Sequence, residues 1–388
     1  MSKKTMIIVA GSVVGLIIAL LLVVWLISIF RTKYFSYEEV RDKIITASES
    51  YYKTHPEMLP TEDGKYTLQY SALVNEGFIK PLNELLKDGN DCTAEIYVYK
   101  DEDNYDYVPK LACGNNYRNV ELYQKVLDAN PVVEFGSGLH TNTAEDGTIT
   151  EYYFRGKVKN NYVRLGYIKD INNEQQPMLW RILSIDKDGV MKIISTEPYA
   201  NKMVYDNRYN ENDKLFNGYN DFENSVLKSM LVKISNNESF LSTKQKSKLV
   251  KKPVCYGNRR GADETKDGSI ECSKKSEPLY FGTITPYEWM RISLDENCVN
   301  QRDLSCTNFN FLYGTLGTSW TTIATDLYTD KAFIFNGASF ELKMTNSSYS
   351  IYPTAYVKPS SLYISGNGTK NSPYQLFKTT TVKTNTPK

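Results

Sequence analysis

The sequence predicts an α+β chain with an N-terminal transmembrane helix, a small α+β module and a larger α+β domain rich in antiparallel strands. Three patterns lead to this class. An uncharged apolar stretch runs from Met6 to Phe30, a helical stripe follows in residues 36–52, and alternating apolar residues recur in hairpin-like segments from residue 92 onward. Apolar residues that recur every three to four positions indicate a helix, and strict alternation indicates a strand. The 388 residues leave room for two or three domains.

The apolar stretch is long enough to span a bilayer, because about 20 apolar residues suffice. A cleaved signal peptide has a shorter apolar core and a small-residue cleavage site, whereas this stretch runs straight into Arg31. We therefore predict an uncleaved signal anchor, residues 1–33, whose partner is the lipid bilayer. Basic residues flank the stretch on both sides in nearly equal number, so the positive-inside rule hardly distinguishes which end is cytoplasmic.

Six cysteines decide the predicted orientation. They fall into three near pairs, Cys92 with Cys113, Cys255 with Cys272 and Cys298 with Cys306. An even, locally paired set is typical of disulfides formed in an oxidising compartment, and no pair has the CxxC spacing of zinc or thioredoxin sites. We predict three disulfides in a single-pass protein of the cell membrane, with the N-terminus inside and the bulk of the chain extracellular. Six reduced thiols in a cytosolic domain are the alternative.

Residues 34–118 are predicted to form the small α+β module. Ser36 and Glu39 have the spacing of a capping box at the start of a helix, and Pro56 stops that helix. A short strand and helix precede a hairpin bracketed by the first cysteine pair, with its turn at residues 101–104. The acidic turn "DEDNYD" raises the question of calcium, but it lacks the glycine and terminal glutamate of an EF-hand loop, which favours a solvated hairpin tip.

Residues 119–150 are rich in Gly, Thr, Asn and Asp and are expected to form a linker. The larger domain is expected from 151 to 377, with a disordered tail in residues 378–388. Its strongest hairpin pattern turns at Asp188 and Gly189. A helix is expected to begin near Asp221. Its buried stripe would be Phe222, Val226, Met230 and Ile234.

The order of elements in residues 5–118 resembles the pilin-like N-terminal module of cell-surface proteins from Gram-positive Firmicutes. The matching pieces are the apolar helix, "ITASESYYKTHPEMLPTEDG", "SALVNEGFIKPL" and the cysteine-bracketed hairpin. The cleavage motif of a processed prepilin is missing. The resemblance implies a pilin-like stalk, and a subunit of a pseudopilus-like assembly is one alternative function.

Residues 151–377 resemble a Firmicutes surface-domain family of unknown function. The matching pieces include "LWRILSIDKDGVMKIIS", "YFGTITPYEWMRIS", "KAFIFNGASF" and "YSIYPTAYVKPSSLYI", in that order. That family looks distantly similar to the C-type-lectin-like fold shared with formylglycine-generating (sulfatase-modifying) enzymes, in which a helix carries an acid-then-Trp motif like "TPYEW". The resemblance implies a C-type-lectin-like architecture for this domain.

The same resemblance raises an enzyme hypothesis, an oxidase or a hydrolase. The formylglycine-generating reaction needs a close cysteine pair that binds copper, and Cys298 and Cys306 are the nearest candidates, although their spacing differs from the family's pattern. The sequence has no G-x-S-x-G, H-E-x-x-H or P-loop motif, and only two histidines. Thr285 and Glu288 have capping-box spacing, so this acid is interpreted as a helix cap rather than a catalyst. We name no catalytic or metal-binding residue and no cofactor. Calcium and copper lack support.

A binding, adhesion or envelope-interaction module is the favoured function, with a carbohydrate, a protein or an envelope polymer as its ligand. Basic and acidic residues nearly balance, 46 to 45, so nucleic acid is not an expected partner. The candidate ligand contacts are the arginine pair of "GNRRG", the capping-box acid and three loop aromatics. They are Arg259, Arg260, Glu288, Tyr313, Trp320 and Tyr328. For Trp320, burial in the core is an equally good interpretation.

Overall fold

The computed structural model describes residues 34–101, 104–169, 174–261 and 263–377 and divides the chain into two compact units, Met1–Asn119 and Val120–Lys388. Within the described ranges β-sheets dominate, and the helices are few and, apart from one of 18 residues, short. The predicted α+β class is therefore wrong, and the fold is mostly β. The reason is local: several segments with a helical pattern form only one or two turns before a cap or an irregular loop ends them.

None of the helices in the described ranges is both long and apolar enough to cross a membrane. The transmembrane helix predicted from Met6 to Phe30 lies outside the described residues, and the single-pass membrane location that depended on it is not supported. The disordered tail predicted for residues 378–388 also lies outside them.

Three disulfides are present, and they join the pairs predicted from the sequence. They are Cys92–Cys113, Cys255–Cys272 and Cys298–Cys306, with sequence separations of 21, 17 and 8 residues. Disulfides persist in oxidising surroundings, so the three bonds indicate an extracellular protein.

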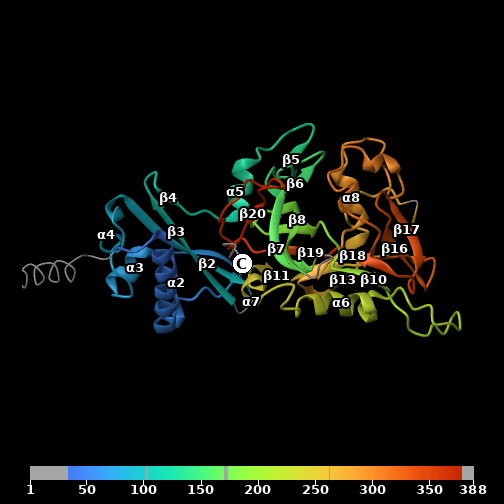
Figure 1. The fold of residues 1–388 in the computed structure, drawn as a ribbon, viewed down its shortest axis with the longest axis horizontal. Helices are drawn as coiled ribbons and strands as arrows, with labels where there is room; N and C mark the ends of the chain where they lie inside the picture. Colours follow the sequence, from blue (N-terminus) through green and yellow to red (C-terminus); the bar gives the residue numbers. More distant parts are fainter. Residues whose placement is uncertain (1–33, 102–103, 170–173, 262, 378–388) are drawn as a thin grey trace, which may run out of the picture. The chain divides into compact units, whose positions relative to one another are not determined.

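The unit Met1–Asn119 is built on a four-stranded antiparallel sheet in the order β1-β2-β3-β4. Its elements are α2 (Tyr37–Thr54), η1 (Pro56–Met58), β1 (Gly64–Gln69), α3 (Tyr70–Asn75), α4 (Leu82–Leu85), η2 (Gly89–Asp91), β2 (Cys92–Asp101), β3 (Asn104–Cys113) and β4 (Tyr117–Arg118). The predicted capping box of Ser36 and Glu39 starts α2, whose apolar stripe packs against β3 (Figure 1). The first disulfide joins the outer ends of the β2–β3 hairpin.

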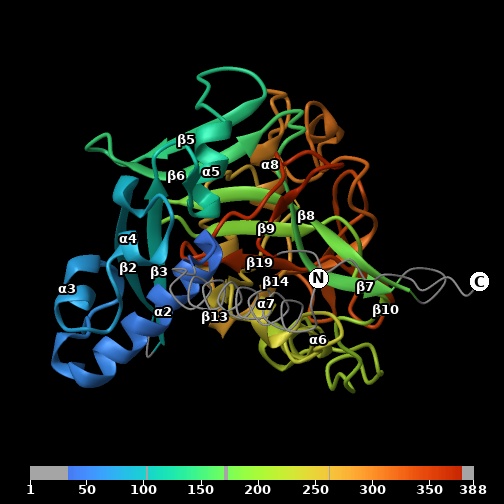
Figure 2. The ribbon, with the colours of Figure 1, turned by 60° about the vertical axis from the view of Figure 1, so that its left-hand side comes forward.

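The unit Val120–Lys388 contains a nine-stranded, a five-stranded and a two-stranded sheet. The nine-stranded sheet has the order β11-β19-β9-β8-β6-β5. In addition, β14 pairs with β19, β7 pairs with β8, and β20 pairs with β7. Figure 2 shows β8, β9 and β19 side by side. Its strands are β5 (Gly138–Thr143), β6 (Ile149–Arg155), β7 (Tyr162–Lys169), β8 (Gln175–Asp186), β9 (Met191–Ser195), β11 (Leu249–Val250), β14 (Phe281–Gly282), β19 (Thr354–Val357) and β20 (Tyr374–Gln375).

The five-stranded sheet runs in the order β10-β18-β15-β16-β17, and β12 pairs with β13 to form the small one. These strands are β10 (Ala200–Met203), β12 (Lys252–Cys255), β13 (Lys275–Leu279), β15 (Ser319–Ala324), β16 (Lys331–Phe335), β17 (Phe340–Met344) and β18 (Tyr349–Ile351). The helical segments are α5 (Leu122–Ala129), η3 (Phe222–Asn224), α6 (Val226–Ile234), α7 (Thr243–Lys246), η4 (Glu271–Ser273), α8 (Pro286–Ile292) and η5 (Leu304–Thr307). Three fully buried tryptophans belong to one core cluster of this unit. They are Trp180, Trp289 and Trp320.

Two expectations about this unit need correction. Residues 119–150 were expected to form a linker, but they contain α5 and β5, and β5 pairs with β6 of the main sheet. The helix expected from Asp221 begins only at Val226, because the Ser225 hydroxyl caps it by accepting a hydrogen bond from the N–H of Lys228. Of the expected stripe, Phe222 and Ile234 are buried, whereas Val226 and Met230 are only partly buried. The residues that α6 buries are Leu227, Leu231 and Ile234, and the first two of these were not expected.

Candidate functional site: an acidic pocket beside helix α8

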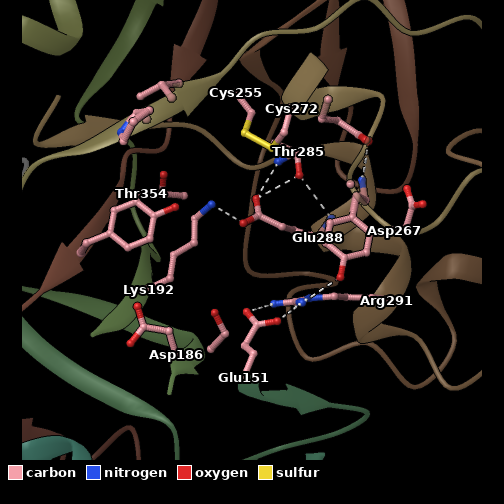
Figure 3. Close-up of a pocket in the computed structure, with 18 of the residues that line it drawn as sticks. Glu151, Asp186, Lys192, Cys255, Asp267, Cys272, Thr285, Glu288, Arg291 and Thr354 are labelled. Carbon is pink, nitrogen blue, oxygen red and sulfur yellow. Dashed lines mark hydrogen bonds and ion pairs between the residues drawn. A yellow bond between two sulfur atoms is a disulfide. The ribbon is translucent and has the colours of Figure 1, made fainter. Parts of the chain in front are cut away.

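A pocket of about 500 Å³ opens between the central strands of the nine-stranded sheet, the β12 segment and α8. Its charged lining carries more acid than base. The acidic residues are Glu151, Asp186, Asp267, Glu271 and Glu288, and the basic ones are Lys192 and Arg291. The Cys255–Cys272 disulfide also lines it and ties β12 to the loop that supplies Asp267 (Figure 3).

Helix α8 begins as the sequence predicts. The Thr285 hydroxyl accepts a hydrogen bond from the N–H of Glu288 at 3.3 Å, and Glu288 Oε2 accepts one from the N–H of Thr285 at 3.0 Å. Pro286 occupies the first helical position, and Trp289 is fully buried. The capping box is confirmed, and it fixes the Glu288 side chain at the wall of the pocket.

The other oxygen of Glu288 forms an ion pair. Oε1 accepts a hydrogen bond from Lys192 Nζ, which reaches it from β9 (Figure 3). The side chains of Lys192 and Glu288 are only 14% and 9% exposed. Burial alone would lower the pKa of Lys192, but the charge of Glu288 outweighs it and the pKa is raised. The lysine is therefore a fixed positive charge inside the pocket.

A second ion pair joins α8 to β6. Arg291 donates from Nη1 and Nη2 to the two carboxylate oxygens of Glu151, at 2.7 and 2.9 Å (Figure 3). Arg291 Nη1 also donates to the Tyr287 hydroxyl at 3.0 Å. Burial alone would raise the pKa of Glu151, yet the hydrogen bonds and charge of Arg291 hold it below its usual value. Two parallel hydrogen bonds of this kind fix orientation as well as distance.

A third pair supports the wall from behind. Arg259 is fully buried and donates from Nη1 to Glu271 Oε1 at 3.0 Å and from Nε to Gln301 Oε1 at 2.9 Å. Glu271 Oε1 also accepts a hydrogen bond from the N–H of Tyr287 at 2.9 Å, while its Oε2 is buried and lacks a hydrogen-bond partner. Burial raises the pKa of Glu271 despite the opposing charge of Arg259.

Two carboxylates of the pocket are not used in these ion pairs. Asp186 Oδ1 accepts hydrogen bonds from the backbone N–H groups of Asp188 and Val190, at 3.0 and 2.9 Å. Burial raises the pKa of Asp186. Asp267 accepts hydrogen bonds from the side chain and backbone of Ser269, which lower its pKa. Figure 3 draws these two acids on opposite sides of Glu288.

The predicted ligand contacts do not converge on one site. Glu288 lines the pocket, whereas Arg259 is buried behind it and is not available to an anion. Trp320 is a core residue, 1% exposed, whose Nε1 donates to the carbonyl of Met203 at 2.7 Å. The other three are at the surface: Arg260 pairs with Asp326, and Tyr313 and Tyr328 are 55% and 48% exposed.

Sequence reasoning missed six of the charged residues that line the pocket: Glu151, Asp186, Lys192, Asp267, Glu271 and Arg291. For Lys192 a signal exists, because it interrupts the apolar run "VMKIIS" of a buried strand. For Glu151 and Arg291 there is none, since 140 residues separate them and only the fold brings them together.

The cysteines offer no free thiolate in this structure. Cys298 and Cys306 are joined as a disulfide, which leaves neither sulfur as the thiolate that copper chemistry would require. Within the described ranges, Asp88, Cys92 and Cys113 lie close enough to hold an ion, but both of these cysteines are oxidised too. The segment considered for calcium includes residues 102–103, which lie outside the described ranges.

Comparison of the chain with protein-family models, with curated proteins and with solved structures found no match. The likenesses to pilin-like modules and to the C-type-lectin-like fold therefore stay predictions.

Proposed function

We propose that unit Val120–Lys388 is an extracellular binding module and that the pocket beside α8 receives its ligand. The observation that carries the proposal is the excess of carboxylates in a pocket whose two cations are already held by partners. Asp186 and Asp267 are left to attract a positive charge. A volume of about 500 Å³ is suited to a ligand of one or two rings.

The ligand class that fits this lining best is a sugar carrying a protonated amine. The amine pairs with Asp186 or Asp267, while the hydroxyls of the ring bond to the remaining carboxylates and to threonine hydroxyls of the wall. Tyr287 and Tyr356 line the same pocket and offer apolar ring faces beside polar tips. The ion pairs of Lys192 and Arg291 hold the wall in place before the ligand arrives, which lowers the cost of binding.

Catalysis has less support than binding. A general acid needs a carboxyl group that is free to exchange its proton with a substrate. The pKa of Asp186 is raised, as it would be for such an acid, but its Oδ1 serves the turn between β8 and β9. Glu271 is 1% exposed and is held by Arg259 from behind.

The proposal is tested by titration calorimetry of the full chain with a glucosamine trimer and with its N-acetylated counterpart, which lacks the charge. The charged trimer is expected to bind at least about tenfold tighter, because a hydrogen bond to a charged group contributes about 1.5–3 kcal/mol. Asp186→Asn or Asp267→Asn, whichever acid holds the amine, should remove most of this preference, because the amide Oδ1 can still accept the turn hydrogen bonds. Asp188→Asn, which removes an equal charge outside the pocket lining, is the matched control. Equal binding of the two trimers would overturn the proposal.

A further inference from the structure

A second hollow of the same unit shares no lining residue with the acidic pocket. It encloses about 450 Å³ between residues 157–159 and the loop 307–313. The aromatic residues of its lining are Phe309, Phe311 and Tyr313, and its charged residues are Lys157 and Lys159. We call it the aromatic groove. It combines flat apolar rings with positive charge, where the pocket beside α8 is acidic.

The backbone holds Phe309 outward at a conformational cost. Its φ angle is +48°, a left-handed conformation that residues other than glycine rarely adopt, and its side chain is 53% exposed. The side chains of its two neighbours are held in place by hydrogen bonds. Asn308 Nδ2 donates to Asp295 Oδ2 at 2.6 Å, and Asn310 Nδ2 donates to the carbonyls of Trp289 and Cys306 at 3.1 and 2.9 Å. An unfavourable backbone that presents a large apolar ring to solvent points to a role for that ring.

The two lysines are available to a ligand. Lys157 and Lys159 are exposed, and neither takes part in an ion pair within the part of the chain that the structure describes. Lys157 Nζ lies 5.5 Å from the centroid of the Phe309 ring, so that charge and ring share one surface. Tyr313, 55% exposed, adds a second ring and a hydroxyl.

We propose that the aromatic groove binds a sugar ring that carries an anionic group, either a carboxylate or a phosphate. The apolar face of the sugar stacks on Phe309 and Tyr313, and the anion pairs with Lys157 and Lys159. An exposed aromatic ring without the lysines would suit neutral sugars, and the lysines without the ring would suit any anion. Their combination selects the acidic sugar. This site is independent of the amine-binding pocket proposed above.

The test is titration calorimetry of the full chain with three probes: trigalacturonic acid, mannose 6-phosphate and the neutral galactotriose. At least one acidic probe is expected to bind at least about tenfold tighter than the neutral one, and the preference should shrink as salt is added. Stronger binding of the carboxylate or of the phosphate probe identifies which anion the groove prefers. Weak or equal binding of all three would overturn the proposal. So would tighter binding of a single-stranded oligonucleotide than of either acidic sugar.

Two variants assign the binding to the groove. Phe309→Gly suits the left-handed backbone, so the protein should unfold at the same or a higher temperature while affinity for the acidic probe falls at least about tenfold. The double variant Lys157→Gln with Lys159→Gln should abolish the preference for acidic over neutral sugar. Tyr209→Ala, which removes an exposed aromatic outside the groove, is the matched control and should leave binding unchanged. Unaltered binding by both groove variants would show that the site lies elsewhere.

Discussion

Substitutions at Lys192 and at Glu288 should have strongly coupled effects on the free energy of unfolding, because the two side chains form an ion pair. We consider Lys192→Met, which keeps the length of the side chain, and Glu288→Gln, which keeps an oxygen to accept from Thr285 and so preserves the capping box. The side chains are 14% and 9% exposed, which places the pair among buried ion pairs rather than surface ones. Breaking a buried pair from one side costs about 3–5 kcal/mol, against about 0–1 kcal/mol for a surface pair.

Each single variant should therefore lose about 3 kcal/mol of unfolding free energy, because it leaves one buried charge without its partner. The double variant removes both charges and should lose less than the sum, by about 1–3 kcal/mol. Urea unfolding of the parent protein, the two single variants and the double variant measures this coupling. The comparison assumes that unfolding free energy falls with urea at the same slope in all four. Additive losses within about 0.5 kcal/mol would refute the reasoning.

The same ion pair determines how the stability of the protein changes at alkaline pH. The pKa of Lys192 is raised in the folded state, so its contribution to stability is complete below the ordinary value of 10.5. It is lost as the pH rises through the higher folded-state pKa. Lys192→Met should remove this part of the alkaline destabilisation.

Three further outcomes are expected. Arg259→Met leaves Glu271 buried without its cation and should lower the unfolding free energy by about 3–5 kcal/mol in urea titration; a loss below about 1 kcal/mol would contradict the pairing. Gly218 and Gly314 have similar φ angles of +76° and +74°. A Cβ at Gly218 would overlap a backbone carbonyl, whereas a Cβ at Gly314 would meet open space. Gly218→Ala should therefore lower the thermal unfolding temperature more than Gly314→Ala does. The pKa of Glu151 is lowered by its arginine partner, so its stabilisation is present above the ordinary value of 4.5 and is lost as the pH falls through the folded-state pKa; Glu151→Gln should flatten that part of the acid unfolding curve.

Local signals in the sequence predicted local structure well. The capping boxes at Ser36 and Thr285 and the turn at Asp188 and Gly189 are present, because each depends on residues within four positions of one another. The disulfide pairs, the most distant of which are 21 residues apart, were also within reach of the sequence. The helix content was overestimated because apolar spacing alone does not show where a cap such as Ser225 will start a helix.

The candidate site could be predicted only in part. Glu288 was identified as a helix cap, but its second oxygen has a partner 96 residues earlier in the chain, on β9, and only the tertiary fold brings the two together. Trp320 was expected among possible contacts because it lies near loop residues in the sequence, with the core as an equal alternative. All six residues of β15 are buried, so Trp320 is a core residue. The aromatic groove was signalled only by Tyr313, because a left-handed backbone at Phe309 leaves no mark in the sequence.

The central claim is that the pocket beside α8 receives an amine-bearing sugar. A crystal structure of the full chain with a glucosamine trimer tests it most directly. We predict a ring of the trimer in this pocket, with its ammonium about 2.7–2.9 Å from a carboxylate oxygen of Asp186 or Asp267 and with the ion pairs of Lys192 and Arg291 intact. A trimer bound elsewhere, or one that enters the pocket with its ammonium directed away from both aspartates, would contradict the account.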